Sequence, residues 1–307
     1  MEISKSQFNW FPGHMNKALK EIEKQLPIVD LVIQVVDSRA PFSTQNTILQ
    51  KLLYKKPMLF IFTKTDLSDI EVTKKWIIFL NSLGHTVFKV DNSGKSLYTE
   101  FKNFVYKLLS KNFELQKKRG IEIPQLNALI CGVPNVGKST FLNRISKFKR
   151  VKVANTPGVT RGLQRIRIDD NIVLIDSPGI LPARIDTQAQ GFILIACNAI
   201  KIQPQITEDF VLSALHYFLN NYPKLIELNY KISLENIESL EYDSLEVNVL
   251  SKIAKQFNFV YSNTLNFEKT IDKIIVDFSM NKFKLVSFEK PDKITGSDRD
   301  IQWNLNP

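Results

Sequence analysis

Residues 132–139 read Gly-Val-Pro-Asn-Val-Gly-Lys-Ser and match the phosphate-loop pattern G-x-x-x-x-G-K-[ST]. In such a loop the glycines let the backbone wrap closely around phosphate groups, so that successive N–H groups point inward at the start of a helix. Lys138 would reach the β- and γ-phosphates, and the hydroxyl of Ser139 would ligate Mg²⁺. The sequence therefore predicts a nucleoside triphosphate site. The contacts expected in this loop come from Asn135, Val136, Gly137, Lys138, Ser139 and Thr140.

Residues 176–179, Asp-Ser-Pro-Gly, follow the apolar run 172–175 and form a second candidate phosphate element. A carboxylate at a strand end can hold Mg²⁺ through water, and the amide of Gly179 can touch the γ-phosphate. Thr160, which lies between the two elements, is the candidate switch threonine that completes the Mg²⁺ coordination, with an ordinary turn threonine as the alternative. The metal is therefore expected on Ser139, Thr160 and Asp176, and catalysis on Lys138 and Thr160.

Residues 63–66, Thr-Lys-Thr-Asp, follow an apolar run that ends at Phe62. The carboxylate of Asp66 can accept hydrogen bonds from the N1–H and the exocyclic amine of guanine. Adenine offers no such pair of donors, and a buried carboxylate left unpaired is costly. The aliphatic stem of Lys64 would lie over the base. Thr63, Lys64 and Asp66 are therefore the expected base contacts, and guanine is the expected base.

The base motif stands before the phosphate loop in the chain, whereas ordinary G domains have the phosphate loop first. A circular permutation explains this order, because the two ends of a domain often lie close together and can be joined. Residues 113–125 would then be the joining segment. The permutation also places the residues from 190 onward directly after the second phosphate element, so that movement there would act on the next domain.

The elements that must position these motifs alternate between strands and helices, which indicates a mostly parallel sheet with right-handed crossovers. Apolar, β-branched runs predict strands at 31–36, 58–62, 87–90, 126–131, 164–168 and 171–176. Apolar residues at helical spacing predict helices at 14–26, 44–55, 70–82 and 97–112. We therefore expect an α/β fold, with a P-loop G domain over 1–189, a smaller all-helical domain over 190–288 and a disordered tail over 289–307.

The chain of 307 residues carries 41 Lys and Arg against 31 Asp and Glu, a formal net charge of +10. Such a charge favours an acidic partner such as RNA, DNA or an anionic membrane surface, with a merely basic protein as the alternative. Between Glu122 and Asp169 there is no acidic residue, while basic residues recur through the same stretch. This stretch is the candidate surface for RNA phosphates, with a solvated basic face as the alternative.

The two cysteines, Cys131 and Cys197, stand in apolar runs and are expected to be small buried residues in a reducing compartment. Three scattered histidines and no close pair of cysteines indicate no zinc-type cluster. Residues 1–10 lack the apolar core of a signal peptide, and no apolar stretch reaches the length of a membrane span. A cytoplasmic location and no membrane partner are therefore expected.

Taken together, these motifs resemble those of the circularly permuted GTPase family, and within it the ribosome biogenesis GTPase A group of large-subunit assembly factors. The matching segments are 10–15, 37–41, 63–66, 132–140, 157–160, 176–180, 282–283 and 287–289. The resemblance implies a GTP hydrolase that binds the maturing large ribosomal subunit and its rRNA in the GTP state and leaves after hydrolysis. It also implies Mg²⁺ as cofactor, an RNA- and ribosome-binding role for 190–288, and a monomer off the ribosome.

The resemblance assigns roles to single residues as well. Ile180 stands where Ras-like enzymes hold a water-orienting glutamine, and His14 is implied instead as the catalytic group that positions the attacking water. Asn135 resembles an asparagine that ligates an activating K⁺ in related GTPases. Asn92 and Ser93 stand where the last base-contacting loop belongs.

Position 63 departs from the family pattern, since Thr63 offers one hydroxyl in place of the usual asparagine amide. Guanine specificity would then rest mainly on Asp66. Two other functions stay open at this point. A GTP-regulated RNA-binding scaffold with negligible hydrolysis fits the missing glutamine, and an ATP-dependent P-loop enzyme shares the phosphate loop but would not need Asp66.

Overall fold

The computed structural model describes residues 13–46, 49, 52–53, 56–90, 96–118, 126–146, 162–168, 170–181, 185, 187–237 and 242–293. The chain divides into two compact units. Unit 1 comprises Met1–Ile200 and Ser287–Asp292, and unit 2 comprises Lys201–Val286 and Lys293–Pro307. The boundary falls at 200 and not at the expected 189, because the apolar helix α6 (Gln188–Ala196) belongs to unit 1.

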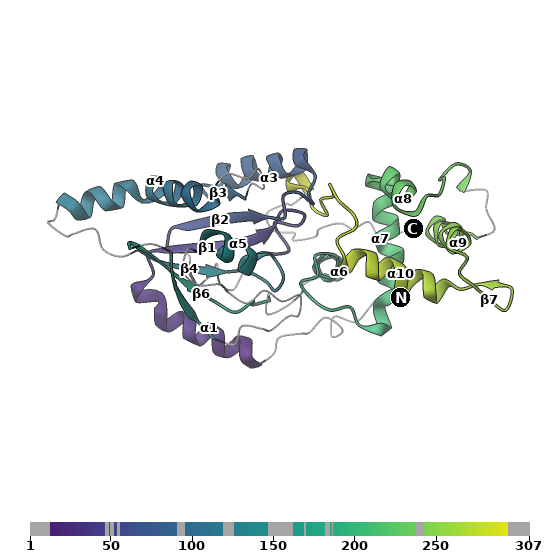
Figure 1. Cartoon of the computed structure of the whole chain (residues 1–307), viewed down its shortest axis with the longest axis horizontal. Coiled ribbons are helices and arrows are strands. Elements are labelled where there is room, and N and C mark those ends of the chain that lie inside the picture. Colours follow the sequence, from purple (N-terminus) through teal and green to yellow (C-terminus); the bar gives the residue numbers. More distant parts are fainter. Residues whose placement is uncertain are drawn as a thin grey trace. The chain divides into compact units, whose positions relative to one another are not determined.

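Unit 1 is built on a six-stranded sheet whose strand order is β3-β2-β1-β4-β6-β5 (Figure 1). The strands are β1 (Leu31–Asp37), β2 (Met58–Thr63), β3 (Thr86–Lys89), β4 (Leu126–Cys131), β5 (Gln164–Arg167) and β6 (Ile172–Asp176). The central strands β1, β4 and β6 are mostly apolar and almost entirely buried, as expected for strands covered on both faces. Their polar residues are Gln34, Asp37, Asn127 and Asp176. All neighbouring strands run parallel except β5, which pairs antiparallel with β6. The expected mostly parallel sheet is therefore confirmed.

The helices of unit 1 are α1 (Gly13–Gln25), α3 (Ile70–Ser82), α4 (Leu97–Lys118), α5 (Lys138–Ile145) and α6. Aromatic side chains join α4 to β3 and α5, because the ring of Phe101 lies 5.8 Å from that of Phe88 and 5.3 Å from that of Phe141. Helix α4 ends at Lys118, so the first part of the expected joining segment 113–125 is helical, and 119–125 lie outside the described residues. Of the helix expected at 44–55, residues 44–46 are not helical, residues 49, 52 and 53 are helical, and the other positions lie outside the described residues.

The parallel arrangement brings the carboxyl ends of five strands, β3, β2, β1, β4 and β6, to one edge of the sheet. Asp37 at the end of β1 is opposite Thr63 at the end of β2, and Ile130 near the end of β4 is opposite Asp176 at the end of β6. The base motif, the phosphate loop and the Asp-Ser-Pro-Gly element all leave the sheet at this edge. In open α/β sheets this is the edge at which ligands bind.

Unit 2 consists of α7 (Thr207–Asn221), α8 (Pro223–Tyr230), α9 (Leu245–Gln256) and α10 (Phe267–Ser279), with a small hairpin. Its core contains Phe210, Phe218, Phe278 and Phe283, whose rings lie as close as 4.7 Å. The hairpin of β7 (Val260–Tyr261) and β8 (Thr264–Leu265) is an addition to the expected helices. Its turn places Ser262 and Asn263 in the left-handed region, with φ of 47° and 66°. No helix in the described part of the chain is long and apolar enough to cross a bilayer.

Residues 287–292, the strap, follow the first segment of unit 2 in the chain but belong to unit 1. The N–H of Phe288 donates to the Arg39 carbonyl at 2.7 Å, and the Glu289 carboxylate accepts the N–H groups of Phe42 and Ser43 at 2.7 and 2.9 Å. The indole N–H of Trp76 in α3 donates to the Glu289 carbonyl at 3.1 Å. The tail was expected to begin at 289, yet residues 289–292 are part of unit 1 because these hydrogen bonds hold them there.

Candidate nucleotide-binding site

The phosphate loop runs from the end of β4 to the start of α5, as the sequence predicts. A side chain at Gly132 would place its Cβ 2.8 Å from the Val35 carbonyl oxygen, so only glycine lets the loop leave β4 this close to β1. Asn135 and Gly137 curl the loop with φ of 59° and 94°, both in the left-handed region. The N–H groups at the start of α5, next to Lys138, are the anion-binding end of the helix.

Lys138 and Asp176 form an ion pair at the strand edge, and both side chains are buried. Burial raises the pKa of Asp176, although the Lys138 ammonium acts in the opposite direction. Oδ2 of Asp176 is buried, and within the described part of the chain it has no hydrogen-bond partner. A buried carboxylate oxygen of this kind is suited to a cation or its bound water. The half-buried Ser139 follows Lys138 in the first turn of α5. These residues therefore fit Mg²⁺.

The Asp-Ser-Pro-Gly element packs directly on the phosphate loop. A Cβ at Gly179 would lie 3.0 Å from the Cα and N atoms of Pro134, which is closer than a side chain tolerates. The N–H of Ile180 donates to the Gly132 carbonyl at 3.1 Å, and the Ile180 side chain is completely buried. An aliphatic side chain in the core cannot orient a water molecule, so the residue after Gly179 does not supply that function here.

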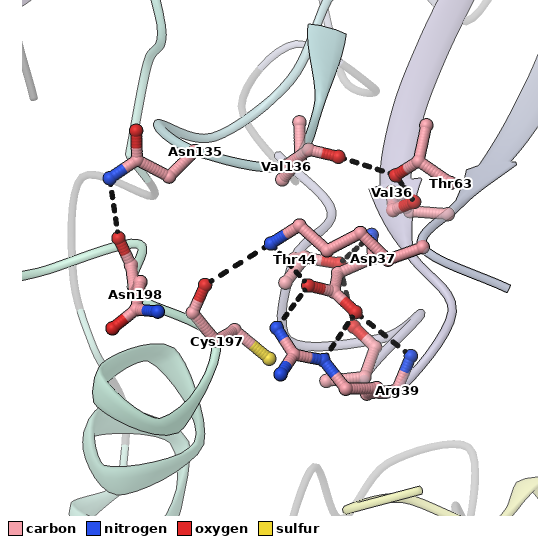
Figure 2. A network of polar contacts seen from close by, with 11 residues as sticks. Val36, Asp37, Arg39, Thr44, Thr63, Asn135, Val136, Cys197 and Asn198 are labelled. Carbon is pink, nitrogen blue, oxygen red and sulfur yellow. Dashed lines mark hydrogen bonds and ion pairs between the residues drawn. The ribbon is translucent and has the colours of Figure 1, made fainter. Parts of the chain in front are cut away.

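The base motif begins with the buried Thr63 at the end of β2. Its hydroxyl lies 2.9 Å from the Val36 carbonyl oxygen of β1 and also hydrogen-bonds to the Val136 carbonyl in the phosphate loop (Figure 2). Lys64 has a φ of 54°, in the left-handed region, and Asp66 is exposed two residues later. The structure therefore brings the base motif and the phosphate loop into contact through Thr63.

Asp37 and Arg39, which received no role from the sequence, form a buried network with Lys64 (Figure 2). The Arg39 guanidinium donates to both Asp37 carboxylate oxygens, at 3.0 and 2.8 Å, and the Lys64 ammonium lies 2.8 Å from Oδ2. Burial alone would raise the pKa of Asp37, but the two cations outweigh it and hold the pKa well below its usual range. The sequence feature that could have predicted this pair is an aspartate at the end of an apolar strand, followed two positions later by an arginine.

The carboxyl end of α6 meets both nucleotide loops. Nδ2 of Asn135 donates to the Asn198 carbonyl at 2.8 Å, and Nζ of Lys64 lies 3.5 Å from the Cys197 carbonyl (Figure 2). Asn198 has a φ of 60°, which turns the chain as the helix ends. Two successive carbonyl groups thus contact one residue of the phosphate loop and one of the base motif.

Several expected site residues cannot be placed. Thr160, Asn92 and Ser93 lie outside the described residues. His14 lies in α1, but its side chain is outside the described part. The remaining expected contacts lie together at the carboxyl edge of the sheet and comprise Thr63, Lys64, Asp66, Asn135, Val136, Gly137, Lys138, Ser139, Thr140, Asp176 and Gly179.

A phosphate loop on a mostly parallel sheet, followed by the Asp-Ser-Pro-Gly element and preceded by a base motif, defines the class of circularly permuted P-loop GTPases. A family model described as "50S ribosome-binding GTPase" matches residues 127–229. Ribosome biogenesis GTPase A of Bacillus licheniformis is 32% identical over 285 residues, covering 92% of this chain and 98% of that protein. The chain belongs to the ribosome biogenesis GTPase A family and is a GTPase.

Other relatives agree with this assignment. A probable ribosome biogenesis GTPase A of Mycoplasma genitalium is 31% identical over 285 residues, covering 92% of this chain and 97% of that protein. The crystal structure of GNP-bound YlqF from T. maritima matches with a TM-score of 0.57 at 21% identity, covering 91% of this chain and all of that one. This structural likeness supports the fold. Membership of a P-loop GTPase family implies Mg²⁺ as the cofactor.

Proposed function

We propose that this GTPase assists assembly of the large ribosomal subunit, binding the maturing particle while loaded with GTP and leaving it after hydrolysis. The names of the relatives support the ribosomal role. The observation that carries the GTP-dependent chemistry is the meeting of Lys138 and Asp176 at the phosphate loop, beside the base motif that contains Asp66. Lys138 neutralises phosphate charge, and Asp66 accepts the donor edge of guanine.

In this proposal Ser139, Thr160 and Asp176 hold Mg²⁺, which when bound neutralises charge on the triphosphate. The fit of Asp176 rests on its buried, unpartnered Oδ2 within the described residues. The amide of Gly179 touches the γ-phosphate, and the close approach of Gly179 to Pro134 keeps it beside the phosphate loop. Thr140 and the N–H groups around Gly137 complete the phosphate contacts.

The attacking water is positioned by His14, the role that the family resemblance implies for it. The side chain of Ile180 is buried in the core and cannot orient water. Asn135 is the proposed ligand of an activating K⁺, which would place positive charge where other GTPases use an arginine. Asn92 and Ser93 contribute the last contacts to the base.

Partner binding is assigned to the basic stretch 122–169 and to the helical unit 2. In that stretch Arg165 and Arg167 are described and exposed on β5. Contacts between such arginines and RNA phosphates would give affinity with little sequence specificity. The two cysteines are free and buried, which fits a reducing compartment, so we place the action in the cytoplasm. Off the ribosome the protein acts as a monomer.

The decisive experiment measures steady-state hydrolysis of GTP and ATP in K⁺ and Na⁺ buffers, with and without purified large subunits. We expect GTP-selective turnover that is faster in K⁺ and rises at least about tenfold with the subunits. An equal rate of GTP turnover with and without the subunits would contradict the ribosomal role. Equal rates of ATP and GTP turnover would contradict the assignment of guanine recognition to Asp66.

A second candidate function, a scaffold that uses GTP only as a ligand, is favoured by the buried Ile180. His14→Ala separates the two. In the hydrolysing enzyme this variant binds GTP normally and loses about a hundredfold in kcat, within the range for loss of a group that assists proton transfer or water positioning. If the variant binds GTP and hydrolyses it as fast as the wild type, His14 is not catalytic. If neither the wild type nor the variant hydrolyses GTP on the ribosome, the scaffold function is favoured.

A further inference from the structure

The hydroxyl of Thr63 is enclosed by two backbone carbonyl groups. Its Oγ1 lies 2.9 Å from the Val36 oxygen and also hydrogen-bonds to the Val136 oxygen, and the side chain is only 4% exposed. A hydroxyl has a single proton to donate, and a carbonyl oxygen can only accept. The single proton of Thr63 is therefore committed to the backbone, shared between the carbonyl groups of strand β1 and of the phosphate loop.

The carbon atoms of Thr63 also lie close to the backbone of the phosphate loop at Gly137. A Cβ at Gly137 would lie 3.4 Å from the Thr63 Cβ, so the two backbones approach closely at this point. Gly137 precedes Lys138, the first residue of α5. The Thr63 side chain is therefore a direct connection between the start of the base motif and the part of the loop that holds phosphate.

The two edges of guanine make opposite demands on a protein. The N1–H and the exocyclic amine donate, whereas N7 and O6 accept. Asp66 can accept from the first edge only, since an ionised carboxylate has no proton. A contact to N7 needs a donor, and the hydroxyl of Thr63 has none left after its bond to the backbone. An asparagine amide has two protons, so one could hold the Val136 carbonyl and the other could reach the base.

We propose that Thr63 is a positioning residue that ties the base motif to the phosphate loop, and that position 63 leaves guanine N7 unread. Base selection then rests on the donor edge of guanine, through Asp66. This inference rests on the proposed guanine nucleotide site. It predicts a difference between this chain and a variant that carries an amide at the same position.

The test compares dissociation constants of GDP, 7-deaza-GDP and ADP by calorimetry, using the full chain. In 7-deaza-GDP a carbon replaces N7 and the donor edge is unchanged. For the wild type we expect GDP and 7-deaza-GDP to bind within about twofold of each other, and ADP far more weakly. Thr63→Asn should prefer GDP over 7-deaza-GDP by about fivefold, the value of one hydrogen bond of about 1 kcal/mol.

The positioning role is tested by Thr63→Val and Thr63→Ser. The valine variant keeps the shape without the hydroxyl and should bind GDP and 7-deaza-GDP more weakly by the same factor, about fivefold. The serine variant keeps the hydroxyl and should recover most of that loss. Valine and serine variants of equal affinity would overturn the positioning role.

A wild-type protein that prefers GDP over 7-deaza-GDP by fivefold or more would overturn the proposal without any variant. In that outcome tight, ADP-excluding GDP binding would leave the proposed function intact. Equal binding of ADP and GDP would instead refute the guanine site on which the inference rests.

Discussion

The ammonium of Lys64 lies 2.8 Å from Oδ2 of Asp37, so the lysine of the base motif is held by a carboxylate at the end of the neighbouring strand β1. The same carboxylate binds the Arg39 guanidinium through two hydrogen bonds. One buried negative charge thus lies between two positive ones. These contacts hold the base motif to the end of strand β1.

Asp37→Asn should destabilise the protein strongly, because Arg39 is 2% exposed and would lose the charged carboxylate that binds its guanidinium through two hydrogen bonds. Breaking a buried pair in this way costs about 3 kcal/mol or more. Urea unfolding followed by tryptophan fluorescence measures the change. The matched control is Glu71→Gln, which breaks the exposed pair between Glu71 and Lys74 and should leave the midpoint unchanged. Equal midpoints for the two variants would contradict the structural role of Asp37.

Asp66→Asn should change the base preference from guanine to xanthine. Xanthine carries a carbonyl where guanine carries the exocyclic amine, and an asparagine amide can donate to it. We expect the GDP affinity to fall by about a hundredfold or more and the xanthosine diphosphate affinity to exceed it. Asp69→Asn is the control, since Asp69 caps α3 in the same loop and asparagine is an equally good cap. The assignment of Asp66 fails if the Asp66→Asn variant still prefers GDP.

Gly179→Ala should impair GTP binding, because the new Cβ would lie 3.0 Å from backbone atoms of Pro134 and must displace the phosphate loop. A small misplacement of catalytic groups can reduce activity by about tenfold to a hundredfold. Gly162→Ala is the control, since among the described residues the nearest atom to its Cβ would be a Glu21 carboxylate oxygen at 3.9 Å. Steady-state kinetics should show a lower kcat/KM for the first variant alone, and equal kinetics would argue against the close approach.

Glu289 makes the stability of unit 1 depend on pH. Burial raises the pKa of Glu289 from an ordinary value of 4.5 to about 7, although the N–H groups of Phe42 and Ser43 act against the shift. The folded protein therefore binds more protons than the unfolded chain between these two values, and stability falls as the pH rises through this range.

Glu289→Gln removes this titration while keeping an oxygen that can accept from the same N–H groups. Between pH 5 and pH 8 the variant should gain on the order of 1–3 kcal/mol relative to the wild type. Urea unfolding at several pH values measures the difference in the free energy of unfolding between the variant and the wild type. The contributions of the other titrating groups are common to both proteins and cancel in this difference. A difference that stays constant with pH would show that the Glu289 carboxyl titrates normally.

Much of the sheet and of the phosphate site could be predicted from local patterns. The phosphate loop is a contiguous motif, and Asp66 and Asp176 each follow an apolar run. Once the strands are known to be parallel, their carboxyl ends must meet at one edge, which explains why these separate motifs converge. The hairpin of unit 2 escaped prediction because strands of two residues are too short to show alternation.

The contact between Asp37 and Lys64 and the contacts of Glu289 could not be predicted, since they join segments that are separate in the chain. Glu289 and Phe42 are separated by 247 positions, and no spacing rule relates them. The polar composition around 289 indicated a tail, whereas hydrogen bonds to Phe42, Ser43 and Trp76 make this segment part of unit 1. Tertiary partners override local composition in such places.

The strap also determines how the protein can be divided for experiments. Unit 1 is discontinuous in sequence, and the larger segment of unit 2, Lys201–Val286, is inserted between Ile200 and Ser287. A truncation after Ile200 would expose the Arg39 carbonyl and leave the Trp76 indole without its acceptor, Glu289. A faithful catalytic fragment would instead excise the insertion and graft residues 287–292 onto Ile200 through a short flexible linker. A protease cut at one junction would likewise leave the two pieces joined by covalent chain at the other.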